Sequence, residues 1–458
     1  MATRFVSGAP LRSGVEGMAF PAVPGRAGAE LLAQLYQLEQ SQYFPETLLR
    51  ARQLRQLAEL ARHAAATSGF YRERLARAGI VDSLDWQRFS QIPLLTRREL
   101  LTEAERIHAT RVPAAHGDWH EIQTSGSTGQ VVAVRRTAIN DLFWLALGMR
   151  DHLWHRRDFR KTFAIIRAHV PIEGDAAPRD WGPPVSLLHD SGPCFTMPLS
   201  TDVAQLVDWL LAKNPTYLLT YPTCLAALLD RFEQMGKRPT DLVEVRTVGE
   251  TLAPQLRERT QAVLGARVCD AYSAQEVGAI ALQCPDSDLY HVHAESVLVE
   301  VMNEAGAPCA VGETGRVVVT DLHNFATPLL RYELRDYAEV GPVCSCGRGL
   351  PTLQRVLGRE RNMVQLPGGR QHWPLVGLHR YREAGEILQY QLVQHDLQQV
   401  EMRLVTRAPL GGEAEQRLIA IVQQALGHPF SIRLSYAQGE LPRSPGGKFE
   451  EFVSLVAR

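Results

Sequence analysis

A run of small and hydroxyl-bearing residues, Thr124-Ser125-Gly126-Ser127-Thr128-Gly129, constrains this chain more than any other stretch of it. It lies between Glu121-Ile122-Gln123 and the β-prone run Val131-Val132-Ala133-Val134, which predicts a strand, a tight loop and a second strand. Glycine lets backbone N–H groups approach and converge on anionic oxygens, and the hydroxyls supply further donors without bulk. The loop therefore favours the binding of a polyphosphate; an ordinary surface turn is the alternative for a run of this composition.

The loop differs from the P-loop of kinases and GTPases, which ends in Gly-Lys-Ser/Thr and opens a helix. Here Gly129 is followed by Gln130 and a strand-like run. Arg135 and Arg136 lie close by in the sequence. The pattern leaves open whether either arginine reaches a phosphate.

The composition describes an ordinary globular chain. Its 458 residues exceed one typical domain, so two or more are expected. The net charge of −1 provides no global attraction to nucleic acid or to an anionic membrane, and no apolar run approaches the ~18 residues of a membrane span. Seven cysteines, an odd number in a long chain, argue against a disulfide framework, so we expect a cytoplasmic protein.

The order of the sequence patterns predicts three parts and a mixed α/β fold. Residues 1–28 are rich in Gly, Ala and Pro, lack a continuous apolar core, and are expected to form a flexible tail rather than a secretory signal. In residues 29–357, short apolar runs alternate with helical segments, which is typical of a largely parallel sheet flanked by helices. From Val297 a strand-rich, Gly-containing pattern predicts a small β subdomain, and residues 358–458 predict a separate α+β unit.

Polar residues follow two of the predicted strands. Gly249 and Glu250 follow the run Val243–Val248, and the segment Asp270-Ala271-Tyr272-Ser273-Ala274-Gln275-Glu276 follows the run Arg267–Cys269. Open α/β sheets form their ligand sites at the carboxyl ends of strands, so these segments predict a ligand site. For Glu276 the alternative is a solvated acid in the first turn of a helix.

Four residues have the composition of a structural zinc site. Cys284, His291, Cys344 and Cys346 offer three thiolates and one imidazole, a closed tetrahedral set for Zn²⁺. His293 could take the place of His291. The alternative is two unrelated pairs of buried thiols together with surface histidines.

Taken in order, these motifs resemble those of the adenylate-forming superfamily, the acyl-CoA synthetases and their relatives. The six-residue loop is similar to the superfamily's phosphate-binding signature, without the Pro-Lys pair that ends many such loops. Phe70-Tyr71-Arg72, followed by Pro93-Leu94-Leu95-Thr96 before the loop, resembles the phenylacetate–CoA ligase branch, and Thr96 with Glu99 also predicts a helix capping box. The resemblance implies a large N-terminal α/β domain with a small β subdomain, and a small mobile α+β C-terminal domain.

The resemblance also implies roles for the residues after the second strand, which match the signature Tyr-Gly-x-Thr-Glu. Asp270 would bond the adenine amino group, Tyr272 would stack on the base, and Ser273 would lie near the α-phosphate. Glu276 would hold the Mg²⁺ that bridges the phosphates, a mode suited to a hard cation. Ser273 stands where Gly is usual and Gln275 where Thr is usual.

Two later segments resemble the superfamily's ribose and hinge motifs. Arg331-Tyr332-Glu333-Leu334-Arg335-Asp336 is similar to Arg-Tyr-x-x-Gly-Asp, so Asp336 would accept from the ribose hydroxyls; Arg335 stands where Gly is usual. Gly358-Arg359-Glu360-Arg361 is similar to the hinge motif, so Arg359 would meet the ribose or a phosphate, with Arg361 at the pivot.

The C-terminal segment Pro442-Arg443-Ser444-Pro445-Gly446-Gly447-Lys448 resembles the motif whose lysine bonds the acyl carboxylate and the α-phosphate during adenylation. A positioned cation acts there selectively, because charge builds on those oxygens in the transition state. Some members of the phenylacetate–CoA ligase branch carry zinc at a similar Cys…His…Cys-x-Cys pattern.

The function implied is ATP-dependent activation of a carboxylic acid, expected to be aromatic, to an acyl-adenylate, followed by transfer to the thiol of coenzyme A. ATP, Mg²⁺, CoA and a structural Zn²⁺ are the expected cofactors and co-substrates. A carrier-protein phosphopantetheine or an amine as acceptor, a silent nucleotide-binding scaffold, and a homodimer are left open. A zinc-dependent nucleic-acid binder is disfavoured by the neutral net charge.

Overall fold

A computed structural model describes residues 10–80, 83–123, 132–168, 170, 179–359, 363–368, 371–372, 381, 383–439, 441, 443 and 449–456. The predicted phosphate loop at 124–129 and Lys448 lie outside the described residues. The chain divides into two compact units, one formed by Met1–Leu334 and Ala338–Val356, the other by Arg335–Tyr337 and Leu357–Arg458.

The first unit contains a mixed sheet in the order β10-β11-β12-β13-β9-β8-β7-β6-β5-β3-β4, eleven strands among the described residues. One half is parallel and consists of β3 (Phe163–Arg167), β4 (Cys194–Pro198), β5 (Tyr217–Thr220), β6 (Glu244–Val248) and β7 (Arg267–Ala274). The remaining strands are β8 (Gly278–Gln283), β9 (Tyr290–Val292), β10 (Val297–Met302), β11 (Thr314–Asp321), β12 (Tyr332–Val340) and β13 (Thr352–Arg359). The parallel sheet predicted from the alternating pattern is confirmed, and the strand-rich segment after Val297 joins it through β13 and β9.

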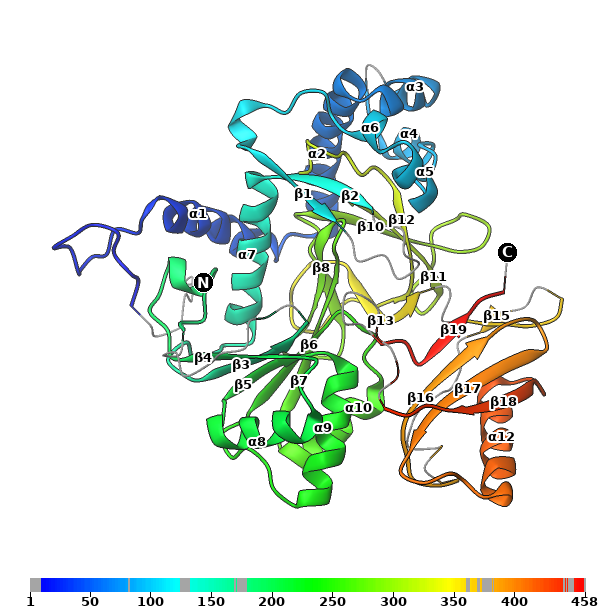
Figure 1. Ribbon diagram of the computed structural model, residues 1–458. Helices are drawn as coiled ribbons and strands as arrows, with labels where there is room; N and C mark the ends of the chain where they lie inside the picture. The colour runs from blue at the N-terminus through cyan, green and yellow to red at the C-terminus, as the bar shows by residue number, and fades with distance from the viewer. Residues whose placement is uncertain are drawn as a thin grey trace. The chain divides into compact units, whose positions relative to one another are not determined.

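Helices cover both faces of the parallel strands. Ala164 and Ile166 on β3 pack with α8 (Val203–Lys213), α9 (Pro222–Met235) and α10 (Pro254–Leu264), which Figure 1 shows together on one side of the sheet. The alternate residues Phe163 and Ile165 pack on the other face with α1 (Arg26–Ser41) and α7 (Ala138–Trp154). Successive strand residues point to opposite faces, so a strand covered on both sides is apolar at every position.

Helix ends explain the placement of α9 and α10. Each begins with proline, Pro222 and Pro254, at a position where a missing N–H is tolerated. Each ends at a glycine with positive φ, Gly236 at +61° and Gly265 at +69°. Glycine adopts this left-handed conformation without the steric penalty of a Cβ, so the chain turns back towards the sheet there.

The segment before the phosphate loop forms a layer of short helices. These are α2 (Glu46–Thr67), α3 (Gly69–Arg77), α4 (Trp86–Ser90), α5 (Arg97–Thr102), α6 (Ala104–Ile107) and the 3₁₀ turn η1 (Ala114–His116). They pack on the antiparallel strands in one apolar core. The hairpin of β1 (Trp119–Gln123) and β2 (Ala133–Thr137) flanks the predicted loop, as the strand–loop–strand pattern indicated. A second 3₁₀ turn, η2 (Val185–Leu187), precedes β4, and Arg12 N donates to Leu188 O at 2.7 Å.

The second unit contains a four-stranded sheet in the order β18-β17-β16-β19, which packs against α12 (Gly412–Leu426). Its strands are β16 (Ile387–Gln394), β17 (Gln399–Thr406), β18 (Ser431–Tyr436) and β19 (Phe452–Ser454), with a further pair β14 (Val364–Gln365) and β15 (Gln371–His372). The predicted α+β character of this part is confirmed. Within the described residues, none of the helices combines the length and apolarity needed to cross a membrane.

Candidate active site

The carboxyl end of β6 carries the first predicted ligand residues. Gly249 follows the strand with φ +80°, a conformation that favours glycine. Glu250 accepts from Thr223 N at 2.9 Å and from Thr223 Oγ1 at 3.1 Å. Thr223 lies in the first turn of α9, so the Glu250 carboxylate accepts from one of the first backbone N–H groups of that helix, at its positive end.

Asp270 lies on β7 and is buried within a set of internal hydrogen bonds. Its Oδ1 accepts from Thr247 Oγ1 at 2.6 Å, and its Oδ2 accepts from the hydroxyl of Tyr290 at 2.9 Å. Its backbone N–H donates to Gln283 Oε1 at 2.9 Å. Burial raises the pKa of Asp270 above its ordinary value. The carboxylate is thus held by residues of β6 and β9, and its contact with adenine stays a prediction.

The pairing of β7 with β8 is irregular where the nucleotide signature was predicted. The register shifts between Tyr272 and Ser273, and such bulges redirect side chains next to ligand sites. Tyr272 is buried in the apolar core under the short helices, and Ser273 is half-buried. Sequence periodicity gives no sign of this bulge.

Glu276, the predicted magnesium ligand, is 8% exposed and forms an ion pair with Arg97, whose Nη1 lies 2.9 Å from Oε1. Arg97 is the first residue of α5, and the predicted capping box of Thr96 and Glu99 is present there. Arg74 fixes this turn further by contacting Glu99 Oε1 at 3.1 Å. The alternative interpretation of Glu276 as a solvated acid is therefore wrong, because its carboxylate is buried and paired.

The two arginines after the loop have different surroundings. Arg136 is buried and its Nη2 donates to the carbonyl of Gln275 at 2.6 Å, beside Glu276. Arg135 lies over the ring of Trp119 at 4.7 Å and reaches Glu105 at 3.3 Å. Arg136 therefore packs against the segment Asp270–Glu276, whereas Arg135 contacts residues on the outer side of the β1–β2 hairpin.

The ribose motif shows why glycine is common at its fifth position. Arg335 has φ +62°, the left-handed region in which a Cβ is unfavourable. Asp336, the next residue of β12, is half-buried. Arg359 is the last residue of β13, and its side chain lies outside the described part, as do Glu360 and Arg361.

The structure brings the four predicted zinc ligands together. Cys284 follows β8, His291 lies on β9, and Cys344 and Cys346 lie in the turn between β12 and β13. Their ligand atoms all lie within 4.8 Å of one another; Cys344 Sγ is 3.8 Å from Cys284 Sγ, and Cys346 Sγ is 3.3 Å from His291 Nε2. Burial lowers the pKa of His291 to about 4, so its ring is neutral and able to coordinate a metal.

The other candidate ligand, His293, is not part of this group. It is buried, and its Nδ1 lies 3.4 Å from Arg150 Nη1. Between the two histidines that the sequence left open, the geometry favours His291. The donor set of three thiols and one imidazole fits zinc.

Comparisons with known proteins agree with this architecture. No family model matches the chain. It is 24% identical over 271 residues to a phenylacetate-coenzyme A ligase of Thermus thermophilus, covering 53% of this chain and 61% of that protein. It is 26% identical over 162 residues to the enzyme of the same name from Escherichia coli, covering 34% and 37%. The aligned parts thus span less than two thirds of these relatives.

Solved structures match over more of the chain. A 2-hydroxyisobutyryl-CoA ligase in the postadenylation state, with a bound acyl-AMP, superposes with a TM-score of 0.68 at 18% identity, covering 91% of both chains. An anthranilate-CoA ligase bound to anthranoyl-AMP gives a TM-score of 0.53 at 14% identity, covering 75% of this chain and 67% of that one. The chain therefore shares its fold with CoA ligases solved with a bound acyl-AMP, and parts of it are similar in sequence to phenylacetate-coenzyme A ligases.

Proposed function

We propose that the chain is an AMP-forming acid–CoA ligase. A carboxylate would attack the α-phosphorus of ATP, releasing pyrophosphate and leaving an acyl-adenylate, and the thiol of CoA would then displace AMP to form a thioester. The observation that carries this proposal is the fold match over 91% of both chains to an acyl-AMP-bound CoA ligase, with Glu250 and Glu276 after the carboxyl ends of the parallel strands β6 and β7. The similarity to phenylacetate-coenzyme A ligases supports an aromatic acid as the substrate.

Within this proposal the predicted residues of each domain, 29–357 and 358–458, would have the following roles. The loop Thr124–Gly129 would cradle the phosphates, Tyr272 would stack on adenine, and Asp336 would accept from the ribose. Lys448 would neutralise charge on the acyl carboxylate and α-phosphate during the first step, then withdraw as the C-terminal domain rotates about the hinge near Arg359. Lys448 is the group on which adenylation would depend most directly.

A magnesium ion fits this site through the Glu276 carboxylate, since Mg²⁺ is usually held by one or two carboxylates and substrate phosphates. The ion would neutralise the phosphates and orient them for attack. Because Glu276 is paired with Arg97, metal binding would require the carboxylate to exchange that partner. Separately, Cys284, His291, Cys344 and Cys346 would hold a structural zinc that joins the strands β8 and β9 to the turn before β13.

The test is exchange of labelled pyrophosphate into ATP in the presence of aryl and aliphatic acids, with Lys448→Ala beside the wild type. We expect exchange with aryl acids and a loss of at least ~100-fold in the variant, by analogy with the removal of one transition-state donor, which costs ~3 kcal/mol. Exchange with aliphatic acids alone would overturn the aromatic assignment. ATP binding without exchange for any acid would favour a silent scaffold.

A second assay identifies the acceptor. The wild type is supplied with the active acid, ATP and either CoA, a phosphopantetheinylated carrier protein or a simple amine. Thioester formation with free CoA at a rate that matches AMP release supports the ligase. AMP release driven by the carrier protein or by the amine would assign one of the alternative acceptors.

A further inference from the structure

A cavity of about 220 Å³ opens in the first unit, away from the predicted nucleotide residues. Its wall includes Arg267, the first residue of β7, whereas Asp270 to Glu276 follow towards the other end of that strand. Since β5, β6 and β7 are parallel, the cavity lies at the amino edge of the sheet and the predicted active site at the carboxyl edge. It is a separate place in the fold.

The wall is rich in cationic side chains. Four arginines line it, together with the acids Glu39 and Asp286: Arg150, Arg156, Arg267 and Arg348. Two of the arginines already form ion pairs and hydrogen bonds within the chain. Arg150 pairs with Glu295 at 2.8 Å and donates to Leu38 O at 2.9 Å, at the end of α1.

Arg267 pairs with Glu244 at 2.7 Å and donates to His155 O at 2.8 Å, at the end of α7. Together with Arg150, it therefore meets the partial negative charge that two helix C-termini bring to the cavity. Arg156 and Arg348 do not contribute to these contacts with the helix C-termini.

Arg348 is held in place by contacts that leave its terminal nitrogens available. Its guanidinium lies over the ring of Trp154 at 4.3 Å, and its Nε donates to Gln42 Oε1 at 3.2 Å. Its closest acid is Asp286, at 3.7 Å from Nη1, beyond hydrogen-bond distance, and the Asp286 side chain is 62% exposed. An oriented guanidinium loses little freedom when it binds an anion.

Arg156 occupies a position that suits glycine. It follows the C-cap of α7 with φ +52°, and it is exposed at the cavity. Among the described residues, the Arg156 guanidinium makes no hydrogen bond or ion pair, so no polar side-chain contact there offsets the strain of its backbone. Strain of this kind is a reason to look for a ligand.

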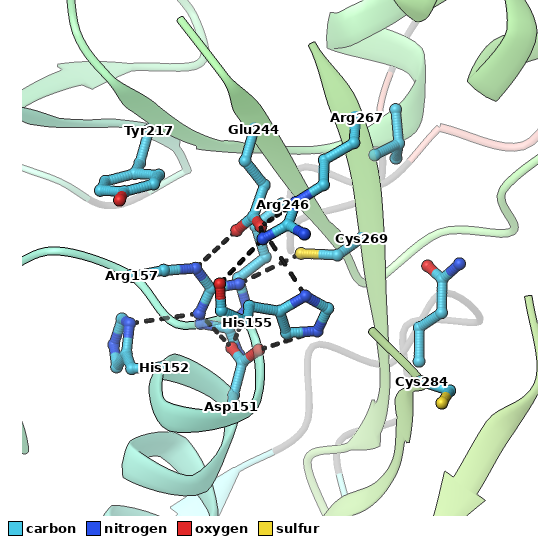
Figure 2. A network of polar contacts seen from close by, with 12 residues as sticks. Asp151, His152, His155, Arg157, Tyr217, Glu244, Arg246, Arg267, Cys269 and Cys284 are labelled. Atoms are coloured by element: carbon cyan, nitrogen blue, oxygen red, sulfur yellow. Dashed lines mark hydrogen bonds and ion pairs between the residues drawn. The ribbon is translucent and has the colours of Figure 1, made fainter. Parts of the chain in front are cut away.

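His155 is a buried residue of the same wall. The residue is 5% exposed, and neither ring nitrogen makes a hydrogen bond. Figure 2 shows it between Asp151 and Glu244, each 3.7 Å from one ring nitrogen. Its ring is therefore the one wall group that is both buried and unsatisfied by hydrogen bonding.

A metal ion is a poor occupant of this region, although Asp151, His155 and Cys269 have ligand atoms within 4.8 Å of one another. The guanidinium of Arg157 lies among them, 3.1 Å from Asp151 Oδ2 and 3.1 Å from Cys269 Sγ (Figure 2). A fixed positive charge in this place repels a cation and supports an anion nearby.

We propose that the cavity binds a phosphate group, either inorganic phosphate or the phosphomonoester of a small metabolite. Arg156 and Arg348 bind its oxygens, and Arg267 and His155 form the wall behind it. Guanidinium groups match phosphate oxygens in geometry and charge, and the enclosed volume holds a phosphate with a small substituent. This site does not depend on the proposed ligase activity.

The test is calorimetric titration of the full chain with inorganic phosphate and with ribose 5-phosphate, at constant ionic strength set with chloride. The informative variant is Arg156→Gly, which removes the guanidinium and relieves the left-handed backbone at once, so a folding defect is not expected. The matched control is Arg160→Gln, an exposed arginine whose partner is Asp158.

We expect saturable binding to the wild type and to the control, and about a tenfold or greater loss in Arg156→Gly, with an unchanged or higher Tm. Tighter binding of the ester would assign a phosphorylated metabolite, and equal or weaker binding would assign free phosphate. If phosphate binds at the predicted catalytic site instead, its affinity would be the same in Arg156→Gly as in the wild type. No saturable binding to the wild type, or equal binding to the glycine variant, overturns the proposal.

Discussion

Replacing Arg97 with glutamine should make the protein more sensitive to magnesium. The Arg97–Glu276 pair is 2.9 Å long, and the two side chains are 19% and 10% exposed. Two unit charges 4 Å apart attract with ~4 kcal/mol at an effective dielectric constant of 20. Desolvation offsets most of this, so we take a net coupling of ~1.5 kcal/mol.

If Mg²⁺ must take the Glu276 carboxylate from Arg97, that coupling opposes metal binding. Removing the coupling between Arg97 and Glu276 should lower the half-saturating Mg²⁺ concentration about tenfold, the factor that corresponds to ~1.4 kcal/mol. The same change leaves a buried carboxylate unpaired, so the metal-free variant should be less stable by ~1–3 kcal/mol. Magnesium should restore part of that loss.

Two measurements check this reasoning. The first is the thermal midpoint of the metal-free and magnesium-titrated protein, with a non-hydrolysable ATP analogue present. The second is the Mg²⁺ dependence of pyrophosphate exchange. Arg98→Gln is the matched control, since Arg98 is the exposed neighbour of Arg97 on α5. An unchanged Mg²⁺ dependence in Arg97→Gln, with normal folding, would refute competition for Glu276.

Three further predictions concern zinc binding and stability. The protein should carry one zinc per chain by elemental analysis. Cys346→Ser should weaken zinc binding by at least ~100-fold, because even the loss of a group that only hydrogen-bonds to a metal ligand weakens binding ~10–100-fold. An unchanged zinc content would contradict the site. Arg335→Gly should raise the free energy of unfolding in urea by roughly 0.5–1 kcal/mol, because it removes a Cβ at φ +62°; a loss of stability would show that the arginine side chain matters more. Burial raises the pKa of Asp321 from 3.8 to about 6, so the folded state holds its proton more tightly and stability should fall by up to ~3 kcal/mol between pH 4 and pH 6. Asp321→Asn should remove that slope, measured as unfolding midpoints across this range.

The sequence predicted the site where local patterns determine structure. Glu250 follows the end of β6, as the apolar run that ends at Val248 predicts, and parallel strands share a carboxyl edge. The predicted end of the next strand at Cys269 is wrong, because β7 continues to Ala274 and Asp270 lies within it. The capping box at Thr96 followed from spacing alone. Each of these inferences needed only neighbouring residues.

Contacts between distant segments could not be predicted in this way. Arg97 and Glu276 are 179 residues apart, and no periodicity relates the start of α5 to the end of β7. The partners of Asp270 come from β6 and β9, so they depend on strand order and register.

The choice between His291 and His293 illustrates the same limit. Residues two apart on a strand point to one face, so alternation cannot separate them. The structure separates them because β9 ends at Val292, and the chain then turns, which takes His293 to Arg150. His291 remains on the strand beside Cys346.

The departures from the family motifs take on a different meaning once the backbone is known. Arg335 in place of glycine was one argument for a scaffold without turnover. Yet the backbone at Arg335 keeps the left-handed conformation that glycine would favour, and Asp336 follows it on the same strand. The substitution therefore adds strain at one residue without removing a group that would touch the nucleotide. Glycine at this position supplies conformation rather than chemistry, so its loss is weak support for a silent protein.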